Sequence, residues 1–135
     1  DLESDSFSHP HYFGLPFYND MAGLFHRANL AISRAGAGSM TELAMTRTPS
    51  ILIPYPYAAE DHQTYNAKVF VEAGAALLFP QDLITAETLQ TKVLGLLRSP
   101  ETLEKMAEAA RKLAVTNSAE LLAALVKTLI ADNSD

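Results

Sequence analysis

Two short segments of the chain carry the side chains best suited to hold a ligand. Residues 33–42 (SRAGAGSMTE) combine two glycines with hydroxyl and carboxylate side chains, and residues 61–67 (DHQTYNA) combine a carboxylate with two amides. Glycine loops that lead into a helix bind phosphate through backbone N–H groups, whereas amides and carboxylates suit sugar hydroxyls, which both donate and accept. The chemistry indicated is phosphate binding by the first segment and hydroxyl binding by the second.

The first segment lies between a predicted buried strand and a predicted helix that Ser39 opens. Gly36 and Gly38 allow a tight turn and a close approach of ligand to backbone. The helix start adds unpaired N–H groups and a positive dipole end, at the sheet edge where α/β folds bind ligands. Thr41 breaks the G-x-G-x-x-G dinucleotide pattern and the Gly-Lys-Ser/Thr of a P-loop is missing, so a plain strand–helix connection stays open as an alternative.

Glu42 has two interpretations. Ser39 and Glu42 fit a capping box, with Ser39 as N-cap and Glu42 as the third helical residue. The alternative places the Glu42 carboxylate on a ribose diol, where it accepts two hydroxyl hydrogen bonds, as acidic residues do in nucleotide-binding folds. The local sequence by itself favours the cap.

The second segment also follows a predicted buried strand and emerges at the same sheet edge. Asp61, Gln63 and Asn66 are close enough to reach one ligand, although Asp61 also suits a helix N-cap. His62 has no second His or Cys at ligand spacing, so we expect no metal and no other cofactor.

Alternating strand and helix patterns must position these segments. Strands are predicted at residues 12–15, 30–33, 50–53 and 75–79. Helices are predicted from residue 19 or 20, from 39 to about 45, from 62 or 63 to 72, and through 86–131, where apolar stripes repeat. The alternation predicts βαβ units and a parallel sheet. Four strands are few for a doubly wound sheet, so we expect the sheet to begin before residue 1.

Composition excludes several classes of function. The 135 residues suit one domain, and a net charge of -6 argues against a basic nucleic-acid-binding surface. The absence of cysteine excludes disulfides and thiolate metal sites. No apolar stretch reaches the ~20 residues that span a bilayer. The polar start without Met predicts no signal peptide and suggests an excised or processed chain.

Together, these segments resemble the MurG-type N-acetylglucosaminyltransferases. The matching stretches are residues 16–21, 33–42, 61–67 and 72–76, in the same order and spacing from about Pro16 to Pro80. The resemblance implies the C-terminal half-domain of a GT-B glycosyltransferase, an α/β fold with a partial Rossmann-like parallel sheet and flanking helices. We therefore expect residues 1–135 to form one sugar-nucleotide-binding domain, with a flexible lead-in at 1–10 and C-terminal helices at 86–131, where the similarity is weaker.

The resemblance also assigns donor contacts for UDP-N-acetylglucosamine. Tyr18 falls at the position whose backbone contacts the uracil edge in the family. The phosphate-binding helix start matches Ala37, Gly38 and Ser39. Glu42 matches the ribose-binding glutamate, which reverses the preference for a cap, and Gln63 matches a glutamine that contacts the N-acetylglucosamine hydroxyls. Thr64 stands where some members have a second glutamine, so that role is not carried over.

The implied partners are an N-terminal acceptor-binding domain and, through it, a lipid-linked acceptor, with no nucleic acid. The implied location is cytoplasmic, peripheral on the inner face of the bacterial plasma membrane. Because the N-terminal half of such an enzyme is not in these 135 residues, we expect no transfer by this chain alone. Two alternatives are a natural donor-binding subunit with a separate partner chain and a non-catalytic folding fragment.

The last predicted helix, residues 119–130, has an unusually wide apolar stripe. The resemblance implies that it crosses to the N-terminal domain. Without that domain, we expect the chain to self-associate or to fold this helix onto its own sheet edge; a helical hairpin with residues 103–113 is the alternative.

Overall fold

The computed structural model describes residues 10–12, 14–15, 19–56 and 62–133, with the side chains of those up to residue 116. Its centre is a parallel sheet of three strands in the order β1-β2-β3: Ala31–Ser33, Ser50–Leu52 and Ala76–Leu78. Ile32, Ile51 and Leu77 stand in register across the sheet. The strands are short apolar runs, and β2 is buried throughout because it is the central strand.

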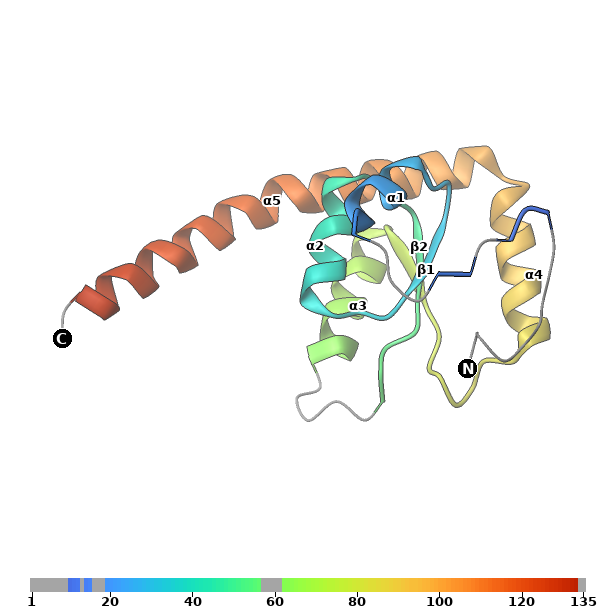
Figure 1. Cartoon of the computed structure of the whole chain (residues 1–135), viewed down its shortest axis with the longest axis horizontal. Helices are drawn as coiled ribbons and strands as arrows, with labels where there is room; N and C mark the ends of the chain where they lie inside the picture. Colours follow the sequence, from blue (N-terminus) through green and yellow to red (C-terminus); the bar gives the residue numbers. More distant parts are fainter. Residues whose placement is uncertain (1–9, 13, 16–18, 57–61, 134–135) are drawn as a thin grey trace.

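Helices cover both faces of the sheet (Figure 1). Two of them, α2 (Ala37–Met45) and α3 (His62–Ala73), are the crossovers between adjacent strands, and α1 (Met21–Arg27) precedes β1. These three helices share one apolar core, which includes Phe25, Leu43 and Phe70. On the other face, Ile51 packs against Leu96 of α4, which spans Ala86–Leu97, and Met106 of α5, which spans Pro100–Asn133.

The long helix α5 contacts α2, α3 and α4 with its first half, and its second half extends away from the sheet (Figure 1). Loops that precede the strands at Asn29 and Pro49 line a groove with Leu103 and Glu104 of α5. The helix therefore covers the amino-end side of the sheet and leaves the carboxyl-end edge to the loops. No helix among the described residues is both long and apolar enough to cross a membrane.

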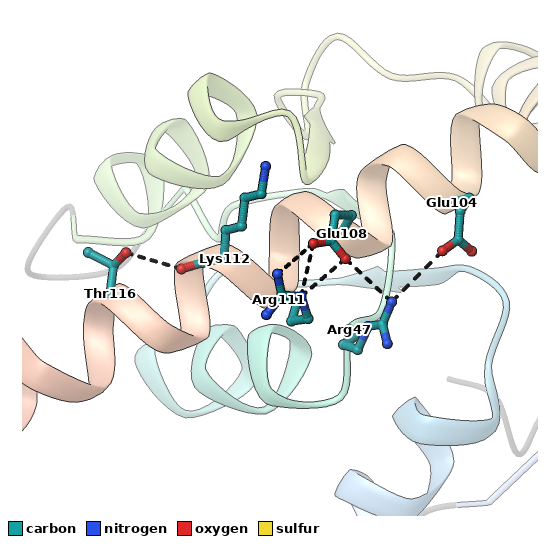
Figure 2. Close-up of polar contacts among 6 residues, drawn as sticks. All are labelled: Arg47, Glu104, Glu108, Arg111, Lys112 and Thr116. Atoms are coloured by element: carbon teal, nitrogen blue, oxygen red, sulfur yellow. Dashed lines mark hydrogen bonds and ion pairs between the residues drawn. The ribbon is translucent and has the colours of Figure 1, made fainter.

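An ion-pair network fastens the end of α2 to α5 (Figure 2). Arg47, in the left-handed conformation at φ 56° just after α2, lies 3.5 Å from Glu108 and 3.8 Å from Glu104. Arg111 donates two hydrogen bonds from Nε and one from Nη2 to the Glu108 carboxylate. The Arg111 hydrogen bond holds the pKa of Glu108 below its ordinary value, and Glu108 raises the pKa of Arg111. Because these groups are exposed to water, the network orients the helices more than it stabilises them.

Most predicted elements are confirmed, within a residue or two of their predicted ends. The helix expected from residue 19 or 20 is α1, with Asp20 as N-cap, and the strands expected at 30–33, 50–53 and 75–79 are β1, β2 and β3. β1 is less buried than predicted, because Ile32 is 49% exposed at the sheet edge.

Two predictions about the elements are wrong, and one helix starts two residues earlier than expected. Tyr12, Gly14 and Leu15 form no strand, although Phe13 lies outside the described residues. The helix expected to open at Ser39 begins at Ala37. The C-terminal segments do not form a hairpin or fold back onto the sheet edge, because Pro100–Asn133 is one continuous helix.

Candidate functional site

The loop between β1 and α2 leaves the start of a helix open. Gly36 is the N-cap residue of α2, in an extended conformation, and no side chain caps the helix. Ala37 and Gly38 are exposed and Ser39 is partly buried, so the predicted phosphate-binding residues form the first turn. Their N–H groups precede the first hydrogen bond of the helix, from Met40 N to Gly36 O. This arrangement attracts an anion through unpaired donors and the helix dipole.

The capping-box interpretation of Ser39 and Glu42, which the local sequence favoured, is wrong. Because the extended backbone of Gly36 starts the helix earlier, Ser39 is the third helical residue and Glu42 lies in the second turn. Gly38 and Glu42 are four positions apart, which places both on one face of α2. The partly buried carboxylate of Glu42 therefore lies on the same helix face as the open first turn.

Among the described residues, Gly38 has no steric reason to be glycine. A Cβ atom added there meets nothing within 4 Å. Glycine inside a helix is less favourable than alanine by roughly 0.5–1 kcal/mol. The space beside Gly38 is therefore open among the described residues.

The second predicted segment meets the first at the carboxyl-end edge. Ile53 N donates to Ser33 O at 2.9 Å, so the loops after β1 and β2 leave the sheet side by side. From α3, Gln63 Oε1 accepts hydrogen bonds from Tyr55 N at 2.7 Å and Ala35 N at 3.4 Å. The structure thus brings Gln63 to the glycine loop, as the sequence predicted.

Arg34 and Asn66 complete the junction of the two loops, and the sequence did not reveal their contacts. Arg34 Nη1 donates to Ile53 O at 3.2 Å, and its guanidinium lies 5.6 Å from the centre of the Tyr55 ring. Asn66 Nδ2 donates to Ala35 O at 3.0 Å. The only sequence signal was the crowding of polar residues after each strand, which says nothing about which atoms pair.

The other predicted site residues are placed less fully. Tyr18 and Asp61 lie outside the described residues. His62 is exposed as the first residue of α3, and no group of three His, Cys, Asp or Glu side chains that could hold a metal occurs in the described part of the chain. Two hollows of about 390 and 370 Å³ lie against α5, and none of the predicted site residues lines either of them.

Comparison with known proteins agrees with this arrangement. A family model described as the glycosyltransferase family 28 C-terminal domain matches residues 1–122. The UDP-N-acetylglucosamine--N-acetylmuramyl-(pentapeptide) pyrophosphoryl-undecaprenol N-acetylglucosamine transferase of Gloeothece citriformis is 65% identical over 136 residues, covering 99% of this chain and 38% of that protein. The transferase of the same description from Rippkaea orientalis is 62% identical, covering 96% of this chain and 37% of that protein. The chain therefore spans somewhat more than a third of these relatives' length.

Solved structures show the same fold. MurG of Acinetobacter baumannii matches with a TM-score of 0.65 and 39% identity, over 73% of this chain and 28% of that one. The spinosyn forosaminyltransferase SpnP, at 15% identity and a TM-score of 0.60, covers 87% of this chain and 34% of its own. These matches confirm the predicted fold class, part of a GT-B glycosyltransferase with a Rossmann-like sheet.

Proposed function

The chain belongs to the glycosyltransferase family 28 C-terminal domains, and from this premise we propose that it binds UDP-N-acetylglucosamine as the donor half of a transferase. The names of its relatives give N-acetylmuramyl-(pentapeptide) pyrophosphoryl-undecaprenol as the acceptor. By the resemblance to the family, the product would be the lipid-linked disaccharide of peptidoglycan. The observation that carries the proposal is the uncapped start of α2, with Gly38 open to solvent and the amides of α3 beside it.

Each part of the donor has a counterpart at this edge. The diphosphate would bind the N–H groups of Ala37, Gly38 and Ser39, whose first turn is open. The ribose diol would donate to Glu42, on the same helix face. The sugar would meet Gln63, and the uracil edge would meet the backbone at Tyr18, where the resemblance to the family is the support.

We propose that residues 1–135 act as one donor-binding unit, with α4 and α5 within the C-terminal helices at 86–131. Its partner would be an N-terminal acceptor-binding domain, which presents the lipid-linked acceptor. The undecaprenol in the relatives' names supports work at a membrane surface, and the resemblance to the family is the support for a cytoplasmic location on the inner face of the plasma membrane. Transfer needs both substrates held together, so this chain alone should show none.

The proposal is tested by titration and by grafting. Calorimetry of the chain with UDP and UDP-N-acetylglucosamine measures binding, which we expect to be weak. Grafting the chain onto the Gloeothece citriformis transferase, in place of the segment 65% identical to it, should give an enzyme that transfers N-acetylglucosamine to the lipid acceptor. A folded graft without transfer, together with a chain that binds neither nucleotide, would overturn the proposal.

A further inference from the structure

Ala35, the residue just before the glycine loop, is held by two side chains of another helix. It is fully buried and lies between β1 and α2, outside the hydrogen bonding of either element. Buried backbone groups need partners, and both partners of Ala35 come from α3. Its N–H donates to Gln63 Oε1, and its C=O accepts from Asn66 Nδ2. Gln63 and Asn66 are three residues apart and therefore share one helix face.

The same contacts determine which way the Gln63 amide faces. The N–H groups of Ala35 and Tyr55 both converge on one atom of Gln63, and only its oxygen can accept them. The opposite atom, Nε2, lies 3.9 Å from the position that a Cβ on Gly36 would occupy. The amide nitrogen thus lies beside Gly36 of the glycine loop, where its N–H groups can donate to a hydroxyl or phosphate oxygen of a ligand.

We propose that Asn66 is a positioning residue for donor binding and that Gln63 shares this role through Oε1, while the contact of Gln63 with the sugar belongs to the function proposed above. The inference rests on the proposed function. Gly36 and Gly38 give the loop wide backbone freedom, and a loop ordered before binding loses less entropy when the ligand arrives. Fixing the N–H and the C=O of Ala35 fixes the two peptide groups that flank it, and with them the direction in which the first turn of α2 presents its N–H groups.

Asn66→Ala in the grafted transferase tests the positioning role. We expect the KM for UDP-N-acetylglucosamine and the inhibition constant of UDP both to rise about tenfold, with kcat within about threefold of the parent value. Both constants rise together because the first turn of α2 binds the diphosphate that the two ligands share. A rise for the sugar nucleotide alone would indicate a direct sugar contact, and a lower melting temperature with both constants unchanged would indicate a purely structural role. Either result overturns the proposal.

Gln63→Glu tests the direction of the amide. Glutamate keeps an oxygen acceptor for the N–H groups of Ala35 and Tyr55 but has no Nε2 hydrogens. We therefore expect a melting temperature close to that of the parent and a KM for the sugar nucleotide at least tenfold higher. Gln63→Ala should lower the melting temperature and raise KM, since both functions are lost. An unchanged KM for Gln63→Glu would refute donation by Nε2.

Matched measurements separate this inference from the proposed function. Gln90→Ala removes an exposed amide from α4, away from the loops, and should change none of these constants. A parent graft that neither binds nor transfers would overturn the proposed function, whereas an active graft whose constants do not change with Asn66→Ala overturns only this inference.

The unsubstituted chain gives a further test that needs no variant to fold. The amide hydrogen of Ala35 should exchange with solvent far more slowly than that of Gly38. Equal exchange rates would contradict the hydrogen bond from Ala35 N to Gln63.

Discussion

Replacing Glu42 by Ala should remove ribose recognition and leave the fold intact. Glu42 lies in the second turn of α2 and does not cap it, since Gly36 is the N-cap residue. The free protein therefore loses no capping hydrogen bond. Alanine has the higher helix propensity, which offsets a lost interaction of roughly 0.3–1 kcal/mol between the carboxylate and the helix dipole. We expect the melting temperature to change little.

The expected loss of affinity follows from the number of hydrogen bonds. A ribose diol donates two hydrogen bonds to the carboxylate, and hydrogen bonds to charged groups contribute roughly 1.5–3 kcal/mol each. Because Glu42 is only partly buried, the lower value is appropriate. Two bonds at about 1.5 kcal/mol give about 3 kcal/mol, which is a loss of about 100-fold in the affinity for UDP.

The assay is a double-mutant cycle with UDP and its 2′,3′-dideoxyribose analogue. UDP should bind about 100-fold more weakly to Glu42→Ala, and the analogue, which lacks both hydroxyls, should bind the parent and the variant equally. Glu42→Gln keeps the side-chain volume, and its affinity for UDP should lie between those of the parent and of Glu42→Ala. An equal loss for both ligands, accompanied by a lower melting temperature, would show that Glu42 supports α2 instead of the ribose.

Three further predictions concern stability and association. Gly38→Ala should raise the melting temperature by about 3 °C, because about 0.5–1 kcal/mol of helix propensity is regained, while weakening UDP-N-acetylglucosamine binding in calorimetry. Arg111 lowers the pKa of Glu108, so the Glu108 carboxylate stabilises the fold above its unfolded-state pKa and this contribution is lost as pH falls through the lower folded-state pKa. Glu108→Gln should slightly lower the melting temperature at pH 7 and have no effect well below pH ~4.3, as thermal melts across pH would show. The full chain should self-associate in sedimentation and a truncation ending at Asn117 should not; a monomeric full chain would contradict this.

Sequence patterns predicted the elements whose own residues determine them. The apolar run that becomes β2 ends at Pro54, and the helix that begins at His62 ends beside Gly74, which has φ 88°. The long helix α5 was divided wrongly at its polar middle, although residues 101–133 contain no Gly or Pro to stop it. The strand expected at residues 12–15 failed because an apolar run forms a strand only where a neighbouring strand pairs with it.

The contacts of the site could not be predicted in the same way. Gln63 and Ala35 are 28 residues apart, and no periodic pattern links them. They meet because β1 and β2 are adjacent and parallel, so the loop after β1 and the helix after β2 begin at one edge. The sequence could place both segments at that edge, but the pairing of single amide atoms depends on the packing of α3 against the loop.

The clearest evidence for a ligand at this edge is that local rules for helices fail there. The sequence contains a capping box at Ser39 and Glu42 that would satisfy the first N–H groups, yet α2 begins at Ala37 without a side-chain cap. Gly38 lies in the same turn although the described residues leave room for a larger side chain. Among the described residues, no side chain therefore occupies the space beside the first N–H groups of α2. Sequences break local rules in this way mainly at functional sites, where a bound group supplies what the protein leaves unsatisfied. An anion at the first turn of α2 would account for the missing cap and for the glycine together.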